Sequence, residues 1–281
     1  MKFAVRLRLC GDERCAIPKE RNRLALSLIK NVLSNYDEDL YNTFYPELPG
    51  GQRGINEKKD FLRKDFTFGM HMGKCKFPKK HESEILLESD HFSLELSFFS
   101  DEEGYKVLVA FMNAKADSEK TFAYKDTKSK KTYEMKVDSI QMKEDLSFNS
   151  RKKVLFKIVS PVLVRADVTE ENHEILKKEL LKKGTAAAIA RDTLHPFLGD
   201  KEGIEILKKR IQLDLNTNED IKIVCHNPKK TIVPLYNGIV PCTLGYLEVE
   251  ASKEILNYIS KAGVGSKRSM GFGYLQGMGE M

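Results

Sequence analysis

The chain has 281 residues, enough for one large domain or two of ordinary size, and 31% charged residues beside 41% hydrophobic ones indicate a packed, strongly charged protein. No apolar run approaches the roughly 18–20 residues that span a bilayer. The N-terminus alternates charged and apolar residues, unlike a signal peptide, so a cytoplasmic protein without a membrane partner is expected. Five scattered cysteines and six dispersed histidines form no disulfide framework or metal motif, and neither a metal nor a cofactor is predicted.

The net charge is +6, and basic residues gather in clusters. Each cluster alone is typical of a solvated surface, whereas their recurrence favours a polyanionic partner such as a nucleic acid. Trp is absent, but Phe and Tyr are plentiful, so aromatic rings are available for stacking on bases. The basic clusters are residues 53–64, 74–80, 128–131, 151–153 and 267–268.

The first half of the chain begins with a strand and a helix. Residues 2–9 alternate strictly between apolar and charged side chains, which predicts a half-buried strand. Apolar residues at helical spacing predict a helix over residues 19–34. A short helical turn is expected at residues 38–44, followed by a long irregular loop. Strands are then predicted at residues 65–77, 85–100 and 105–113, and a charged hairpin at residues 125–143.

Near residue 150 the pattern of elements restarts. Residues 153–165 predict a strand interrupted by Pro161, which places it at a sheet edge or at a bulge. The last helix is expected at residues 252–263, where Gly263 ends it. The elements between and after them are helices at residues 170–183, 185–198 and 203–211, and strands at residues 220–227, 231–242, 243–251 and 272–279.

Each half therefore contains a strand, one or more helices and further strands, without the regular strand–helix alternation of a doubly wound nucleotide fold. This order predicts an α+β protein made of two tandem ferredoxin-like domains of the split βαβ type. We expect the first domain at residues 1–150 and the second at residues 151–281.

The segment from Gly263 to Gly273, GVGSKRSMGFG, is the most distinctive stretch of the chain. It matches neither a Walker A loop nor a dinucleotide fingerprint, since it follows a helix and precedes a strand. Glycines at such a junction would expose backbone N–H groups, and Lys267 and Arg268 would add charge, giving a cradle for phosphates. A helix cap with a simple connection to the next strand is the alternative.

Two Gly-x-Gly triplets separated by five residues resemble the C-terminal glycine-rich loop of the RAMP superfamily of CRISPR proteins. Residues 245–263 resemble the penultimate strand and last helix of its repeat-processing endoribonucleases, and residues 2–9, 24–35 and 155–165 resemble their opening strands and first helix. The resemblance implies two ferredoxin-like domains that bind CRISPR repeat RNA and cut it once per repeat. It implies metal-independent attack by a 2′-hydroxyl, leaving a 2′,3′-cyclic phosphate and a 5′-hydroxyl. CRISPR effector-complex proteins and a second copy of the chain are the other partners considered.

Most relatives carry a histidine in the loop after the first helix, but the first histidine of this chain is His71. Aligned on the resemblance, Tyr45 falls near the histidine position, with Lys30, Tyr41 and Lys64 as further catalytic candidates and His71 as a weaker one. The residues expected to bind RNA are Gly263, Gly265, Lys267, Arg268, Ser269, Gly271, Phe272, Gly273, Arg21, Arg23, Arg53, Lys58 and Lys59.

Three functions stay open at this stage. The first is a histidine-free endoribonuclease, which should be slow because a tyrosine with an ordinary pKa of about 10 is a poor base at neutral pH. The second is a non-catalytic RAMP-type subunit that holds repeat or guide RNA in an effector complex. The third is an unrelated pair of ferredoxin-like domains in which the glycine-rich loop is structural.

Overall fold

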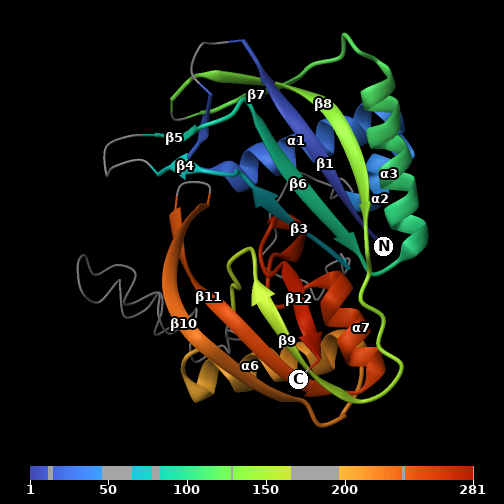
Figure 1. Ribbon diagram of the computed structural model, residues 1–281, viewed down its shortest axis with the longest axis vertical. Coiled ribbons are helices and arrows are strands. Elements are labelled where there is room, and N and C mark those ends of the chain that lie inside the picture. Colours follow the sequence, from blue (N-terminus) through green and yellow to red (C-terminus); the bar gives the residue numbers. More distant parts are fainter. Residues whose placement is uncertain are drawn as a thin grey trace, which may run out of the picture. The chain divides into compact units, whose positions relative to one another are not determined.

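The computed structural model describes residues 1–11, 15–45, 65–77, 83–127, 129–165, 196–235 and 238–280 (Figure 1). Contacts between Cα atoms divide the chain into two compact units. Unit 1 comprises Met1–Phe66 and Met70–Lys143, and unit 2 comprises Thr67–Gly69 and Glu144–Met281. Among the helices in these ranges, none is long and apolar enough to cross a membrane.

Unit 1 is built around a five-stranded antiparallel sheet in the order β3-β6-β1-β8-β7, with a small three-stranded sheet in the order β2-β5-β4. Through the main sheet the chain therefore runs strand–helix–helix–strand–strand–helix–strand–strand, with β1 at the centre of the sheet. Its elements are β1 Lys2–Cys10, β2 Ala16–Pro18, α1 Arg21–Tyr36, α2 Glu38–Phe44, β3 Phe66–His71, β4 Cys75–Lys76, β5 Glu84–Leu87, β6 His91–Phe98, α3 Asp101–Ala116, β7 Phe122–Lys125 and β8 Thr132–Lys143.

The core of unit 1 follows from the two periodicities in its sequence. Val5 and Leu7 of β1 are fully buried and alternate with the exposed Arg6 and Arg8, as a strand with one covered face requires. In α1, Leu24, Leu28 and Val32 recur every four residues and are also buried, so one stripe of this helix faces the core.

The strand predicted at residues 105–113 is wrong, because this segment lies within helix α3. The apolar, β-branched run suggested a strand, but the preceding residues carry the signals that start a helix. The Oγ atom of Ser100 accepts a hydrogen bond from the backbone N–H of Glu103 at 3.2 Å, and acidic residues fill the first turn. Val107, Phe111 and Ala114 then meet the core at helical spacing. With this correction, unit 1 has the complete split βαβ order.

Unit 2 repeats the same architecture with a four-stranded sheet in the order β10-β11-β9-β12. In chain order these are the second, third, first and fourth strands, which is the ferredoxin-like arrangement. The predicted fold class is therefore confirmed for both units. The elements described in unit 2 are β9 Lys152–Ile158, α6 Lys201–Leu215, β10 Lys222–Leu235, β11 Gly238–Ala251, α7 Lys253–Ala262, a short 3-10 turn Arg268–Met270 and β12 Leu275–Glu280.

Two strand predictions in unit 2 need correction. Strand β9 ends at Ile158, before Pro161, and lies between β11 and β12 rather than at a sheet edge. The three strands predicted over residues 220–251 are two long strands, whose pairing shifts between His226 and Lys229. The helices predicted at residues 170–183 and 185–198 lie wholly or almost wholly outside the described residues.

Helices α6 and α7 cover one face of the sheet in unit 2. Leu207 of α6 and Leu256 of α7 are fully buried in the same cluster as Phe156 of β9 and Leu247 of β11. Since side chains alternate along a strand, the neighbours of these strand residues point to the opposite face, where polar residues predominate.

Candidate functional site

The glycine-rich loop of unit 2 has a backbone that most residues could not adopt. Gly263, Gly265, Gly271 and Gly273 all have positive φ angles. At Gly273, where φ is +69°, an added Cβ would lie 1.8 Å from the carbonyl oxygen of Val264, which is far inside contact distance. Glycine is therefore required there both for the left-handed conformation and for the close approach of two backbone segments.

Hydrogen bonds within unit 2 fix this loop. The N–H of Val264 donates to the carbonyl of Gly273 at 3.0 Å, and the N–H of Gly273 donates to that of Pro161 at 3.0 Å. The N–H of Ser266 donates to the carbonyl of Leu163 at 2.7 Å. These amides are satisfied internally and do not form the open phosphate cradle that the glycine content suggested. The loop is a rigid support for side chains.

Arg268 does not face solvent, contrary to the expectation that it contacts phosphate. Its side chain is 8% exposed, and its Nη1 atom lies 3.1 Å from Oδ2 of Asp214 in α6. The same nitrogen donates to the hydroxyl of Tyr258 in α7 at 2.7 Å, and that hydroxyl donates to Asp214 at 3.2 Å. We call Arg268, Asp214 and Tyr258 the loop lock, because together they tie the loop to both helices.

Phe272 also has a structural position instead of the predicted contact with RNA. It is fully buried and packs with Leu163 and Cys242 in a small apolar cluster beneath the loop. Buried aromatic rings stabilise by the apolar area that they remove from water and present no face to a ligand. Ser269, by contrast, is partly exposed.

Lys267 is the exposed cation of the loop. It has a left-handed φ of 58°, which is unusual for a residue with a side chain. Its pKa is lowered from the ordinary lysine value, first by partial desolvation and second by the positive charge of Arg165. Sequence reasoning missed Arg165, which follows β9 and is exposed. Two like charges held close together favour a bound anion, since an anion relieves their repulsion.

In unit 1, three of the predicted catalytic residues lie together. The Nζ atom of Lys30 in α1 is 4.6 Å from the centre of the Tyr45 ring, and the Tyr45 and Tyr41 ring centres are 5.6 Å apart. Burial lowers the pKa of Lys30. Burial, and secondarily Tyr41, raise the pKa of Tyr45 well above the ordinary tyrosine value, so its phenol stays neutral at physiological pH. Lys64, Arg53, Lys58 and Lys59 lie outside the described residues.

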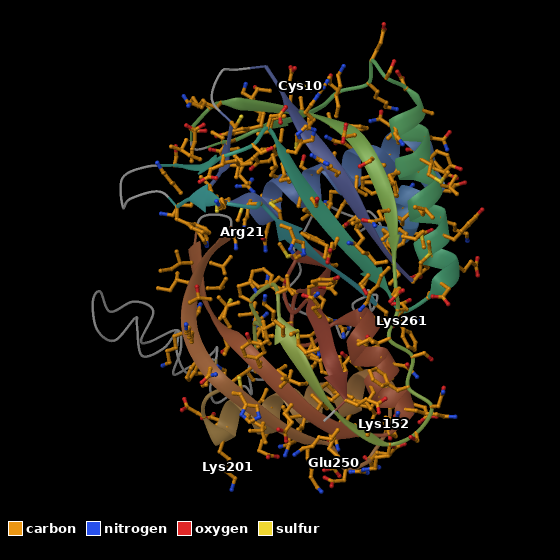
Figure 2. The ribbon with its side chains drawn as sticks, viewed as in Figure 1. Cys10, Arg21, Lys152, Lys201, Glu250 and Lys261 are labelled. Carbon is orange, nitrogen blue, oxygen red and sulfur yellow. The ribbon has the colours of Figure 1, made fainter. Side chains whose placement is uncertain are left out.

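Arg21, labelled in Figure 2, and Arg23 lie at the start of α1 and contact other residues of unit 1. The guanidinium of Arg21 lies 5.8 Å from the centre of the Phe77 ring, and burial lowers its pKa. Arg23 forms an ion pair at 3.0 Å with Glu20, whose side chain is 4% exposed. The second of these arginines therefore neutralises a buried carboxylate, which is a structural role.

His71 forms a pair with a carboxylate on β6 of unit 1. Its Nε2 atom is 3.1 Å from Oε2 of Glu95, while Lys143 lies 3.8 Å from the other carboxylate oxygen. A carboxylate in this position holds the imidazole ring in one orientation. His71 therefore has the surroundings of a residue that can transfer a proton, which its place in the sequence did not reveal.

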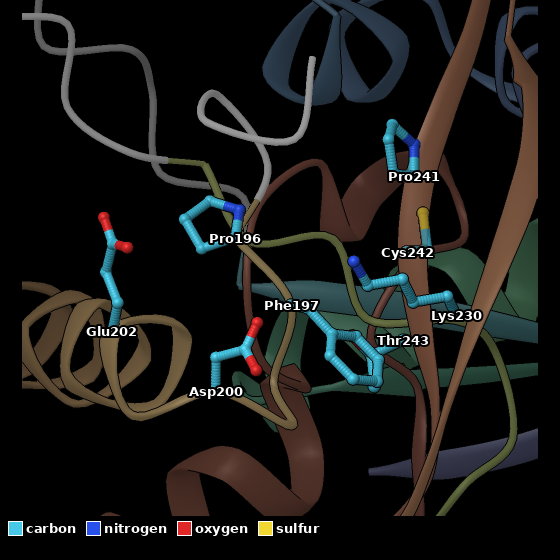
Figure 3. Close-up of a pocket in the computed structure, with 8 residues that line it drawn as sticks. All are labelled: Pro196, Phe197, Asp200, Glu202, Lys230, Pro241, Cys242 and Thr243. Atoms are coloured by element: carbon cyan, nitrogen blue, oxygen red, sulfur yellow. The ribbon is translucent and has the colours of Figure 1, made fainter. Parts of the chain in front are cut away.

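Two further features of the described residues concern small ligands and metals. A cavity of about 90 Å³ in unit 2 is lined by Phe197, Lys230 and Thr243, among others, with the Lys230 ammonium 5.2 Å from the Phe197 ring centre (Figure 3). Binding sites for molecules of nucleotide size occupy roughly 300–1,000 Å³, so this cavity is too small. No group of three or more His, Cys, Asp or Glu side chains able to hold a metal occurs in the part of the chain that the structure describes.

Comparison with solved structures shows which proteins share this fold. A Cas6-related protein from Pyrococcus furiosus is 18% identical, with a TM-score of 0.70 over 100% of this chain and 99% of that one. A RAMP protein described as binding different RNA substrates is 16% identical, with a TM-score of 0.65 over 99% of this chain and 100% of that one. The protein therefore has the tandem ferredoxin-like fold of the RAMP-type CRISPR proteins.

The sequence of the second half of the chain matches a family model. Residues 140–276 match the family model for the C-terminal part of the CRISPR-associated protein Cas6. A structure described as CRISPR-associated protein Cas6 is 15% identical, with a TM-score of 0.60 over 99% of both chains. A comparison of the sequence with curated proteins finds no match.

Proposed function

We propose that this protein binds CRISPR repeat RNA and cleaves the precursor transcript by attack of a 2′-hydroxyl on the adjacent phosphate. The observation that carries the proposal is the glycine-rich loop within the region that matches the Cas6 family model, where backbone hydrogen bonds to Pro161 and Leu163 fix the segment that presents the exposed Lys267. Solved structures of similar fold include a RAMP protein with RNA substrates and a Cas6 product complex, which supports RNA as the partner.

The reaction needs a base at the 2′-hydroxyl, a cation at the phosphate and an acid at the departing 5′-oxygen. Lys30 supplies the amine, and its lowered pKa increases the neutral fraction that accepts a proton at physiological pH. Tyr45 stays protonated because its pKa is raised, and it can donate a hydrogen bond or a proton, with the ring of Tyr41 beside it. His71 with Glu95 is the second group in unit 1 with acid–base character.

In this scheme the attacking oxygen loses its proton to the base and forms a bond to phosphorus. The bond from phosphorus to the 5′-oxygen breaks, and that oxygen takes a proton from the acid. The products are a 2′,3′-cyclic phosphate and a 5′-hydroxyl, and no metal is required by the proton balance.

Incubation with repeat RNA in the presence of EDTA tests this proposal. Cleavage to a cyclic phosphate, its loss with a 2′-deoxy nucleotide at the cut site, and slower cleavage by Lys30→Ala than by the parent would support it. Tyr45→Phe, Tyr41→Phe and His71→Ala, assayed beside the parent, assign the remaining roles. Absence of product in all buffers, with RNA binding retained, would refute cleavage.

One observation favours a second function, RNA binding without cleavage. Tyr45 stands near the expected histidine position, yet burial raises its pKa and makes it a poor base. A non-catalytic subunit would bind repeat or guide RNA together with CRISPR effector-complex proteins. Association with those proteins and formation of a homodimer are part of the proposal, and light scattering of the purified protein tests the homodimer.

A further inference from the structure

A row of four side chains crosses the sheet of unit 2 on the face opposite α6 and α7. His226 of β10 pairs with Tyr246 of β11, Tyr246 pairs with Lys157 of β9, and Lys157 pairs with Gln276 of β12. Residues paired in register share one face of a sheet, so these four side chains stand next to one another. With strands about 4.8 Å apart, the row spans about 14 Å. We call it the cross-strand row.

The cross-strand row is accessible from solvent. Lys157, His226 and Gln276 are exposed and Tyr246 is partly exposed, while the adjacent Phe156, Leu247 and Leu275 are buried against the helices. The alternation leaves one aromatic ring on a central strand, with a cation on the neighbouring strand. No carboxylate forms an ion pair with Lys157 in the part of unit 2 that the structure describes.

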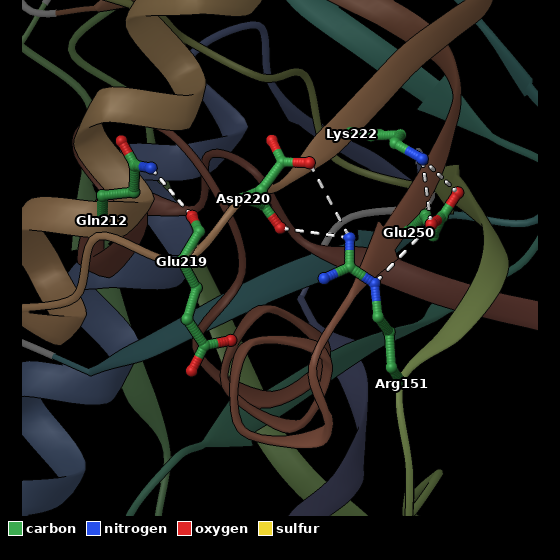
Figure 4. A network of polar contacts seen from close by, with 6 residues as sticks. All are labelled: Arg151, Gln212, Glu219, Asp220, Lys222 and Glu250. Carbon is green, nitrogen blue, oxygen red and sulfur yellow. Dashed lines mark hydrogen bonds and ion pairs between the residues drawn. The ribbon is translucent and has the colours of Figure 1, made fainter.

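The acidic residues on this face are paired with basic ones, one of which, His226, belongs to the cross-strand row. Glu248 lies 2.6 Å from Lys153 and 3.0 Å from Nε2 of His226, and these contacts, Lys153 first, lower the pKa of the Glu248 carboxyl. Further along the face, Glu250 lies 3.2 Å from Lys222 and 3.6 Å from Arg151 (Figure 4). The carboxylates are thus paired, and the charge left over at the cross-strand row is positive.

This combination of groups matches the chemistry of single-stranded RNA. Four-stranded sheets of the split βαβ type bind single strands by stacking bases on aromatic side chains that project from the sheet. We infer that the cross-strand row binds one nucleotide of single-stranded RNA. Tyr246 stacks on its base, Lys157 contacts its phosphate, and His226 and Gln276 reach the edges of the base. The inference rests on the proposed function, and it adds a second RNA contact away from the glycine-rich loop residue Lys267.

The test uses the full-length protein and a fluorescein-labelled single-stranded RNA of about 12 nucleotides, a length within the usual range of single-strand sites. Loss of a stacked base by alanine substitution weakens binding by about tenfold to a hundredfold, which is the expected effect of Tyr246→Ala on the anisotropy titration. Tyr246→Phe keeps the ring and should bind like the parent. Tyr105→Ala removes an exposed tyrosine from α3 of unit 1 and is the matched control.

Ultraviolet cross-linking to the RNA, followed by peptide mapping, should place an adduct on Tyr246. Lys157→Ala should reduce the slope of log binding constant against log salt concentration by about 0.7. If Tyr246→Ala binds like the parent while Lys267→Ala is weaker, the cross-strand row is refuted and the proposed function stands. If Tyr246→Phe is as weak as Tyr246→Ala, stacking is refuted. If the parent itself binds no RNA, the proposed function fails and the inference fails with it.

Discussion

Replacing Arg268 by methionine should destabilise unit 2 because it leaves the carboxylate of Asp214 buried without its inner cation. Both side chains are nearly inaccessible, at 8% and 10% exposure, and their atoms are 3.1 Å apart. Breaking a buried ion pair on one side costs about 3–5 kcal/mol. Asp214 keeps a contact of 3.4 Å with Arg210 and the hydrogen bond from Tyr258, so we expect the lower end, about 3 kcal/mol.

Arg210→Met is the matched control, since Arg210 contacts the same carboxylate from a half-exposed position on α6. A surface pair one helical turn apart contributes about 0.5 kcal/mol or less, so this variant should unfold almost like the parent. Urea unfolding followed by circular dichroism gives the free energies, and amide hydrogen exchange resolves the loop and α7 separately. Equal stability of Arg268→Met and Arg210→Met would refute the loop lock.

Further predictions concern RNA binding, the loop backbone and the buried amine. Lys267→Ala should weaken RNA binding and reduce the slope of log binding constant against log salt concentration by about 0.7. The urea concentration at the midpoint of unfolding should stay unchanged, and a lower midpoint would indicate that Lys267 has a structural role. Gly273→Ala should destabilise unit 2 by at least about 2 kcal/mol, because the added Cβ would clash with the Val264 carbonyl oxygen and the backbone there has a left-handed φ. Urea unfolding measures this loss. Gly11→Ala is the control, since Gly11 also has a positive φ but a Cβ there would meet no neighbouring atom. Burial lowers the pKa of Lys30 below its unfolded value, so its contribution to stability rises with pH between the two pKa values. Lys30→Met should remove this rise when the free energy of unfolding is measured between neutral and alkaline pH. If the free energy of unfolding changed with pH in the variant as it does in the parent, the burial of the amine would be contradicted.

The sequence predicted the fold class because hydrophobic periodicity marks most elements directly. Residues 2–9 alternate as a half-buried strand does, and the apolar residues of α1 and α7 recur at helical spacing. Helix α3 was mistaken for a strand because Val107 and its neighbours read as a short apolar run, in which the two periods are hard to distinguish. Ser100 and the acidic first turn were the local signal that would have corrected it.

The candidate site was predictable only in part. The glycine spacing located the loop, and the resemblance brought Lys30, Tyr41 and Tyr45 into consideration before the structure placed them together. The sequence could not show that Lys267 is exposed while the adjacent Arg268 is buried, because the partner of Arg268, Asp214, lies more than fifty residues away in the chain. Arg165 was missed for the same reason, since its relation to Lys267 depends on tertiary structure.

The loop lock also has a consequence for how this motif varies among homologous sequences. Positions 214, 258 and 268 form one charge-balanced unit, so substitutions at any of them should be accompanied by compensating changes at the others. Position 267 carries no such constraint, and lysine and arginine should interchange there freely. The two adjacent basic residues would thus show different substitution patterns. Position 268 would vary together with its buried partners, and position 267 would vary as the proposed contact with RNA allows.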